Sequence, residues 1–486
     1  MINKILSDSL VTGIRTIIST IRGLIVIPLI TNLLGAGSYG IWTTVLAVIG
    51  LVKSTGNLHL HGALIRFGSR DELHEKTFSD ILFLVIVVGA FVSVCVFFIG
   101  NMLNISSMVG DEVGDSILLL LASSLLIYSS MVWQIIWNFP RAKGNVKTYD
   151  IIATVKDIIE SIGLALVFLT GYGITSGIIM LIVITMGFNA LVLYMIDRNY
   201  TLVRPSASRY VQYLRYSVPL IPQIVSGKLL QSGDKYLILY FLTPAAVGIY
   251  SVAYSVSSML VKFTSILNST LYPTISNAWD EGHKKEISYT YGIIFRGYSI
   301  LAIPALCGII LLSDSLIELI STEEIATEAI VLMPILTFAF IIKGAHNPLS
   351  FILTASERTE QIAIVTIAGT FSNLLLNIVL IPELGIFGAA VATAFSSTII
   401  FVLIYYYASS KISLPIPYAT IFRSGIATLL MGLVLYHLPI EESVVQLLIY
   451  PIVGSTIYFV ILLASGEITR GEMKKALNAS KRLLDW

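Results

Sequence analysis

The stretch LVTGIRTIISTIRGLIVIPLITNLL, from Leu10 to Leu34, decides the class of fold. It is long enough to cross a bilayer, because a spanning helix needs about 20 mainly apolar residues. It nevertheless contains Arg15 and Arg22. Seven residues make nearly two helical turns, so both guanidinium groups lie on one face. A charge near the bilayer centre costs about 2.5–3.5 kcal/mol. We therefore expect this face to line a wet cavity that binds an anion.

The composition places the whole chain in a membrane. Of its 486 residues, 56% are hydrophobic and 12% are charged, against roughly 25% charge in soluble proteins. Cys95 and Cys307 both lie in apolar runs, so we expect neither a metal site nor a disulfide framework. The first apolar run is too long for a cleavable signal peptide. No cofactor and no nucleic acid partner are expected.

Apolar runs predict about fourteen transmembrane helices, and hence an all-α polytopic membrane protein. The predicted spans are 10–33, 39–63, 78–100, 116–139, 148–170, 174–196, 212–241, 247–276, 291–313, 325–353, 361–381, 386–408, 419–438 and 444–465. In the seventh, Pro219, Pro222 and Gly227 predict a broken helix.

The loops between these spans alternate in charge. One set of alternate loops contains Lys or Arg, and the other set contains Asp or Glu and neither Lys nor Arg. The positive-inside rule therefore places the basic loops and both termini in the cytoplasm. The basic loops contain Arg66, Arg70, Lys76, Arg141, Lys143, Lys147, Arg198, Arg204, Arg209, Lys284, Lys285, Arg358 and Lys411, and the acidic loops contain Asp111, Glu112, Asp115, Asp314, Glu318, Glu323, Glu324, Glu383, Glu441 and Glu442.

An internal repeat predicts two pseudo-symmetric six-helix lobes. The stretch LLGAGSYGIWTTVL, from Leu33, aligns with FLTPAAVGIYSVAY, from Phe241, and GYGITSG, from Gly171, aligns with ELGIFGA, from Glu383. The offsets are 208 and 212 residues. An even number of helices per repeat keeps both halves in the same orientation. We expect lobes at 1–208 and 209–410, two further transmembrane helices at 411–465, and a basic amphipathic cytoplasmic tail at 466–486.

The predicted spans contain more basic than acidic residues. The acidic residues that we count there are Asp157, Glu160 and Asp234, so an excess of positive charge remains even if every acid is paired. The surplus cations should line a central aqueous cavity, because lipid-facing charge is costly. As substrate-binding residues we predict Arg15, Arg22, Lys53, Lys228, Lys262, Arg296 and Lys343, and as coupling or ion-pair residues Lys156, Asp157, Glu160, Asp234 and Lys235.

Less functional interpretations stay open for some of these residues. Lys53, Lys235 and Arg423 are also placed to snorkel to an interface. Lys156 and Glu160 have the i,i+4 spacing of a plain ion pair. The chain shows no nucleophile elbow, phosphate-binding glycine loop or Cys/His metal spacing, and its carboxylates are too scattered for glycoside chemistry. We therefore predict that it is not an enzyme.

Three segments carry a resemblance to a known family. They are PLITNLLGAGSYGIWTTVLAVIGL from Pro28, GDKYLILYFLTPAAVGIYSVAYSV from Gly233, and NIVLIPELGIFGAAVATAFSS from Asn377. In these segments the chain resembles the polysaccharide flippases of the multidrug/oligosaccharidyl-lipid/polysaccharide exporter superfamily. The resemblance implies two six-helix lobes facing each other in a V, plus two C-terminal helices. It also implies a cell-membrane protein that moves a polyisoprenoid (pyro)phosphate-linked oligosaccharide to the outer leaflet by alternating access. In that family, basic residues of the first helix are held to meet the pyrophosphate, a pattern that Arg15 and Arg22 match.

Two alternatives remain open. One is a cation-coupled multidrug exporter of the same superfamily, although that branch uses membrane carboxylates and the first helix has none. The other is a non-transporting scaffold of a glycan-assembly complex, for which the basic tail is the only indication. Expected partners are the lipid-linked oligosaccharide and membrane lipids, with glycosyltransferases or a polymerase as further candidates.

Overall fold

The computed structural model describes residues 2–68, 74–103, 116–199, 203, 205–206, 209–438 and 443–468, and all regular structure in these ranges is helical. The side chains of residues 2–14, 16–17, 21, 24, 146, 260, 262–270 and 272–273 lie outside this description. The helices are α1 (Ile2–Gly56), α2 (Leu60–Gly68), α3 (His74–Met102), α5 (Ser116–Ala142), α6 (Val146–Leu169), α7 (Ile174–Asn199), α8 (Tyr210–Ser217), α9 (Ile221–Phe241), α10 (Pro244–Asp280), α11 (Lys284–Leu311), α12 (Ser313–Ile320), α13 (Glu323–Ala355), α14 (Thr359–Leu384), α15 (Ile386–Ser409), α16 (Tyr418–Tyr436) and α17 (Ser443–Ala464).

The first two predicted spans form one helix, α1, with a break at Gly35. There the backbone has φ 86° and ψ 174°, a conformation that glycine adopts without steric cost. A straight helix of this length would be about 80 Å long, far beyond the roughly 30 Å apolar thickness of a bilayer. The break at Gly35 is compatible with the two predicted crossings, which stay a prediction. The helix ends at Gly56, before the predicted end at residue 63, because Leu58 and His59 adopt positive φ values of 49° and 56°.

The predicted break in the seventh span also exists. A 3-10 turn, Val218–Leu220, separates α8 from α9. Proline lacks an N–H and cannot continue the helical ladder, which explains a change of helix type beside Pro219 and Pro222. Gly227 lies inside α9, whose helix continues through it.

The other predicted spans each overlap one of the long helices, and ten described helices are long and apolar enough to cross a membrane. Helices α6, α9 and α10 are not among the ten. Each of α6 and α9 carries three or more charged residues in its interior. The protein is thus an all-α polytopic membrane protein. The count of fourteen spans stays a prediction.

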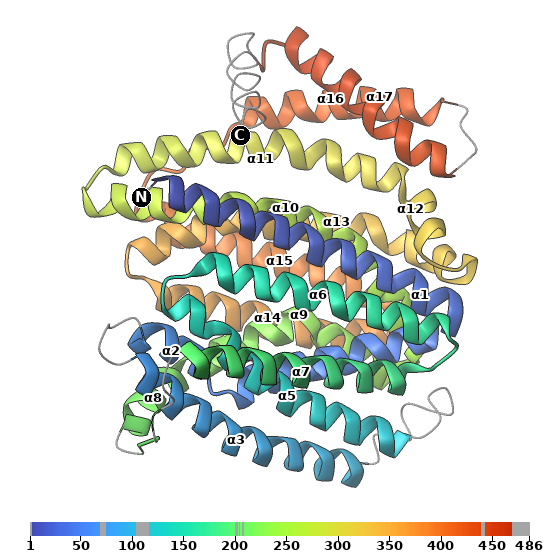
Figure 1. Cartoon of the computed structure of the whole chain (residues 1–486). Coiled ribbons are helices and arrows are strands. Elements are labelled where there is room, and N and C mark those ends of the chain that lie inside the picture. Colours follow the sequence, from blue (N-terminus) through green and yellow to red (C-terminus); the bar gives the residue numbers. More distant parts are fainter. Residues whose placement is uncertain are drawn as a thin grey trace. The chain divides into compact units, whose positions relative to one another are not determined.

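The chain falls into two compact units by contact. The first is Met1–Ser255 with Ile320–Ile325 and Thr366–Ala392, and the second is Val256–Leu319 with Ala326–Val365 and Thr393–Trp486. In the first unit, α3 packs on α5, α5 on α7, and α6 on both α1 and α7 (Figure 1). The lobes predicted from the repeat, 1–208 and 209–410, stay a prediction.

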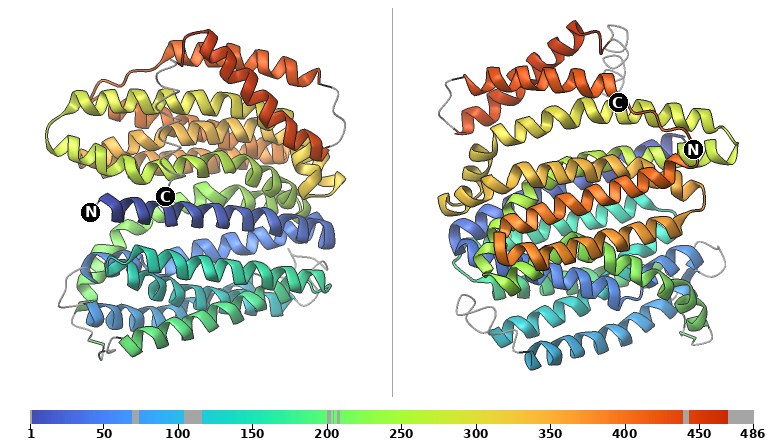
Figure 2. Two further views of the ribbon diagram at one scale, coloured as in Figure 1. Left: turned by 45° about the horizontal axis from the view of Figure 1, so that its top comes forward. Right: turned by 180° about the vertical axis from the view of Figure 1, so that it is seen from behind.

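In the second unit, α11 packs against α16, which packs against α17 (Figure 2). These last two helices lie within the range 411–465, whose separation from the two lobes stays a prediction. Their buried core consists of Ala427, Met431, Leu435, Tyr450, Tyr458 and Leu462. Most of the predicted tail, from residue 469 onward, lies outside the described residues.

Candidate functional site: a charged cavity in the first unit

Four helices of the first unit enclose a cavity of about 330 Å³. Each contributes side chains at helical spacing, three or four residues apart, so one face of every helix points inward. The side chains are mixed in character: basic, acidic, hydroxyl, amide and indole. The lining residues are Arg15, Arg22, Leu46, Ile49, Gly50 and Lys53 of α1, Leu126, Ser130, Trp133, Gln134 and Trp137 of α5, Ala153, Lys156, Asp157 and Glu160 of α6, and Leu181 and Thr185 of α7.

Arg15 is held in a fixed position beside this cavity. Its Nη1 donates to Asp150 Oδ1 at 2.9 Å, and the Asp150 side chain is only 1% exposed. Its guanidinium carbon lies 4.6 Å from the ring centre of Trp137 and 5.5 Å from that of Tyr149. Those two rings stack at 4.1 Å. An ion pair and two cation–π contacts thus fix one guanidinium group.

Arg22 has two carboxylate partners. Its Nη1 lies 3.0 Å from Asp157 Oδ1 and 2.7 Å from Glu160 Oε2. Glu160 also accepts a hydrogen bond from Lys156, the i,i+4 pair that the spacing indicates. The Lys156 ammonium lies 5.3 Å from the ring centre of Trp133. Four charged groups therefore form one network at the wall of the cavity.

The shortage of carboxylates expected from the sequence does not leave Arg15 and Arg22 unpaired, because each has a carboxylate partner. Asp150, which the sequence analysis missed, and Asp157 are seven residues apart on α6, as the two arginines are on α1. Each ion pair joins residues 135 apart in sequence, so α1 and α6 run in the same direction with matched charge spacing. That shared spacing was the signal available in the sequence.

Lys53 differs from the other cations of the cavity. Among the described residues, no carboxylate lies at ion-pair distance from its ammonium group. Lys156 and Lys228 lie close enough to repel its charge, and Glu160 close enough to attract it. Four basic groups thus share three carboxylates around this cavity, which keeps an excess of positive charge.

The other predicted residues of the first unit lie on α9. Asp234 is buried, and its two oxygens accept hydrogen bonds from Tyr250 at 2.7 Å and from Asn377 at 2.6 Å. The Lys235 ammonium lies 5.9 Å from the ring centre of Tyr254, and Lys228 donates a long hydrogen bond of 3.4 Å to Gln231. These three charged residues do not line the cavity.

The remaining predicted residues belong to the second unit. Lys262 lies in α10, but its side chain is outside the description. Lys343, in α13, places its ammonium 5.7 Å from the ring centre of Phe340. Arg296, in α11, donates through Nε to Glu467 at 2.9 Å, and Arg423 binds the same carboxylate at 3.0 Å. Arg296 therefore holds the segment that follows α17.

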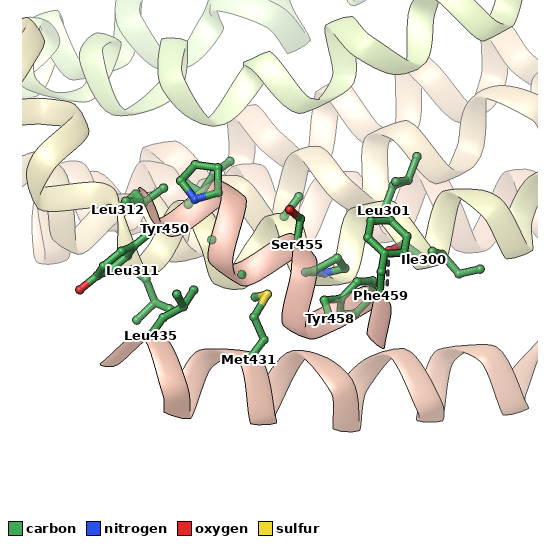
Figure 3. A pocket seen from close by; sticks show the side chains of 16 residues that line it. Ile300, Leu301, Leu311, Leu312, Met431, Leu435, Tyr450, Ser455, Tyr458 and Phe459 are labelled. Carbon is green, nitrogen blue, oxygen red and sulfur yellow. Dashed lines mark hydrogen bonds between the residues drawn. The ribbon is translucent and has the colours of Figure 1, made fainter. Parts of the chain in front are cut away.

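A second cavity, also about 330 Å³, lies in the second unit and is almost entirely apolar. Figure 3 shows Met431 and Leu435 of α16 on one side, with Tyr450 and Tyr458 of α17 opposite. Tyr458 donates to the carbonyl of Ile300 at 2.8 Å. Among the described residues, those that line this second cavity carry no charge, so the charged cavity is the better candidate for recognition of an anion.

A family model described as polysaccharide biosynthesis protein matches residues 29–326, which is more than half of the chain. The chain belongs to this family. The match runs from the first half of α1 into the start of α13, and so includes all of α5, α6 and α7.

A curated relative is the probable low-salt glycan biosynthesis flippase Agl15 of Haloferax volcanii. It is 28% identical over 280 residues, which cover 57% of this chain and 59% of that protein. The chain thus matches less than two thirds of this relative's length.

Two solved structures share the fold. Lipid II flippase MurJ in an inward closed conformation has a TM-score of 0.77 at 17% identity, over 94% of this chain and 98% of that one. An inward-facing multidrug resistance MATE family transporter has a TM-score of 0.68 at 14% identity, over 81% and 94%. At such low identity these likenesses show the fold alone.

Proposed function

We propose that this protein is a flippase that moves a polyisoprenoid (pyro)phosphate-linked oligosaccharide from the cytoplasmic to the outer leaflet of the cell membrane by alternating access. The observation that carries the proposal is the cavity of Arg15, Arg22, Lys53 and Lys156 inside membrane-spanning helices. Family membership, the name of the Haloferax relative and the MurJ-like fold support it.

The chemistry of the cavity suits such a headgroup. Guanidinium groups bind phosphate oxygens through forked pairs of hydrogen bonds. Protein of low dielectric constant surrounds the cavity, so the contacts between guanidinium and phosphate groups are stronger there than in bulk water. Hydroxyl, amide and indole groups of Ser130, Gln134 and Trp133 offer partners for sugar hydroxyls and sugar faces. The prenyl tail would stay in the surrounding lipid, so only the polar part of the substrate enters the protein.

Asp234 is the residue to which we assign energy coupling. It is a buried carboxylate within a membrane helix, and its oxygens accept hydrogen bonds from Tyr250 and Asn377. Binding or release of a cation there would change the charge of the first unit without changing the headgroup cavity.

The test is transport by purified protein. A fluorescent lipid-linked oligosaccharide is incorporated into proteoliposomes, and its arrival in the opposite leaflet is measured by accessibility to a membrane-impermeant quencher. Protein-dependent translocation is expected, while protein-free vesicles give the uncatalysed rate. Equal rates with and without protein would contradict the proposal.

The MATE-like fold and the acidic residues in the cavity support one alternative function, a cation-coupled multidrug exporter. The coupling cation would have to compete with Arg22 and Lys156 for Asp157 and Glu160, so the cavity suits a cation less well than an anion. Efflux of a cationic dye from the same vesicles, without movement of the lipid-linked glycan, would favour this alternative.

A further inference from the structure

We propose that Asp157 and Glu160 are exchangeable counter-ions: they bind Arg22 and Lys156 while the cavity is empty, and they release these cations to the phosphate groups of the substrate. This inference rests on the proposed function, since it requires an anionic ligand. It assigns a role to two acidic residues that would otherwise oppose the binding of an anion.

The two arginines differ in the way that exchange requires. Arg15 is paired with Asp150, whose side chain is 1% exposed and does not line the cavity. Trp137 and Tyr149 flank its guanidinium group. A carboxylate in this position cannot leave without exposing a buried charge to an apolar environment. Arg15 and Asp150 are therefore a permanent pair.

Arg22 is held by carboxylates that face the cavity itself. Asp157 and Glu160 both line it; the Asp157 side chain is 21% exposed and the Glu160 side chain 7%. A released Asp157 carboxylate would meet the water of the cavity rather than hydrocarbon, and Glu160, although more buried, borders the same cavity. The partly exposed pair of Arg22 and Asp157 also contributes little net free energy. An incoming phosphate can thus take the guanidinium group from Asp157 without leaving that carboxylate unsolvated.

Exchange predicts selectivity for multivalent anions. A monovalent anion that displaced both carboxylates would bring less negative charge than it removed from Arg22 and Lys156. The pyrophosphate of a lipid-linked sugar carries two negative charges and so replaces both, and Lys53, which has no carboxylate at ion-pair distance among the described residues, supplies a further cation. The cavity should therefore discriminate against chloride and against a singly charged phosphodiester, and favour a pyrophosphate headgroup.

The same arrangement lowers the free-energy cost of the protein in its unloaded state. Unpaired cations inside a membrane protein are expensive. In the unloaded state Asp157 and Glu160 neutralise Arg22 and Lys156, and in the loaded state the headgroup does so. Both states are then close to balanced in charge, as a carrier that must return empty requires.

The experiment measures the affinity of the purified full-length protein for inorganic pyrophosphate by titration calorimetry. Wild type is compared with Asp157→Asn, Glu160→Gln and the control Asp150→Asn. Removal of a competing counter-ion should tighten binding about fivefold or more, within the usual range of coupling between sites. Asp150→Asn removes the same charge but loosens Arg15, so it should not tighten binding.

Unchanged or weaker binding in both Asp157→Asn and Glu160→Gln would overturn the proposal. Equal tightening by Asp150→Asn would also overturn it, because the gain would then reflect net charge alone. If Glu160→Gln fails to fold, the Asp157→Asn variant decides, because the Asp157 side chain is less buried. Difference infrared spectroscopy gives a second readout: pyrophosphate should shift carboxylate bands of wild type that are absent in Asp157→Asn.

Failure of the exchange and failure of the proposed function are distinguishable. If the wild type binds pyrophosphate and flips the lipid-linked glycan but the variants bind pyrophosphate no more tightly, only the exchange proposal is contradicted. If the wild type neither binds pyrophosphate nor flips the glycan, both the exchange proposal and the proposed function are contradicted.

Discussion

Arg15 and Arg22 carry the same charge on the same face of one helix, yet their surroundings give them different roles. Arg15 contacts Trp137, Tyr149 and the buried Asp150. Among the described residues, the carboxylates that pair with Arg22 themselves face the cavity. The first arginine therefore helps to build the wall, and the second is available to a ligand.

We expect Arg22 to be the more sensitive of the two in transport. Arg22→Gln should lose flipping at normal expression, because an amide cannot replace a charged, forked donor. Arg22→Lys should recover part of the rate, and Arg22→Glu should be the worst variant because its carboxylate repels the headgroup. The measurement is flipping of lipid-linked glycan by purified proteins at matched amounts. Equal rates for wild type and Arg22→Glu would end the anion-cavity interpretation.

At the scale of helices, α1 and the start of α10 cross at an unusually short distance. A Cβ on Gly40 would lie 1.8 Å from the carbonyl oxygen of Pro244, and one on Gly248 would lie 2.1 Å from that of Ala36. The hydroxyls of Thr43 and Ser251 are 3.0 Å apart. Both pairs, Gly40 with Gly248 and Thr43 with Ser251, are separated by 208 residues, the offset of the sequence repeat. Such a self-matched contact is typical of a two-fold axis.

Gly40→Ala should therefore force α1 and α10 apart. We expect a loss of roughly 1–3 kcal/mol of stability, as for other overpacked sites, seen as a lower melting temperature of the purified protein. Gly50→Ala is the matched control, because nothing lies within 4 Å of its added Cβ. That variant should melt at the wild-type temperature or slightly above, since alanine favours the helix. Equal melting temperatures for the two variants would show that the crossing can relax freely.

Glu467 joins three elements of the second unit. It accepts hydrogen bonds from Arg296 of α11 and from Thr420 and Arg423 of α16. Burial by itself would raise the pKa of its carboxyl, but the hydrogen bonds from Thr420, Arg296 and Arg423 outweigh burial and hold the pKa below its ordinary value of 4.5. The segment after α17 is thus fixed to α11 and α16 by a charged carboxylate.

The stability that Glu467 contributes should depend on pH. Because its pKa is lower in the folded than in the unfolded protein, the contribution is complete above pH 4.5 and is lost as the pH falls through the folded pKa. Glu467→Gln should cost about 1–3 kcal/mol at neutral pH, the range for hydrogen bonds to charged groups. Melting temperatures of the two proteins should converge on acidification. A constant difference at all pH values would assign the effect to packing instead.

For the whole molecule, the alternating charge of the loops predicts the orientation in the membrane. A cysteine placed at Asp111 or Glu441 should react with an impermeant maleimide added outside intact cells. One placed at Lys143 or Lys284 should react only after the cells are opened. The parent protein should have Cys95 and Cys307 replaced by alanine, so that the maleimide can label only the introduced cysteine. Labelling at Lys143 in intact cells would overturn the topology.

Much of the fold was predictable because it depends on local properties of the chain. Hydrophobic length predicted the helices, and proline predicted the interruption beside Pro219, whereas the break at Gly35 came only from the structure. These features arise from burial in a membrane and from backbone sterics within a few residues. The lobe boundaries and the fourteen spans remain predictions on the same basis.

The sequence by itself determined a helical membrane protein with cations facing inward, since periodicity fixes which face of a helix carries a charge. Only the tertiary structure decided which groups meet. Asp150 and Asp157 reach Arg15 and Arg22 across 135 residues, and Glu467 reaches Arg296 across 171. A pattern within one helix says nothing about which neighbour packs against it, because that choice is made by side-chain packing over the whole unit. The cavity is therefore a property of the folded chain: residues that the sequence shows only as scattered charges become a paired network there.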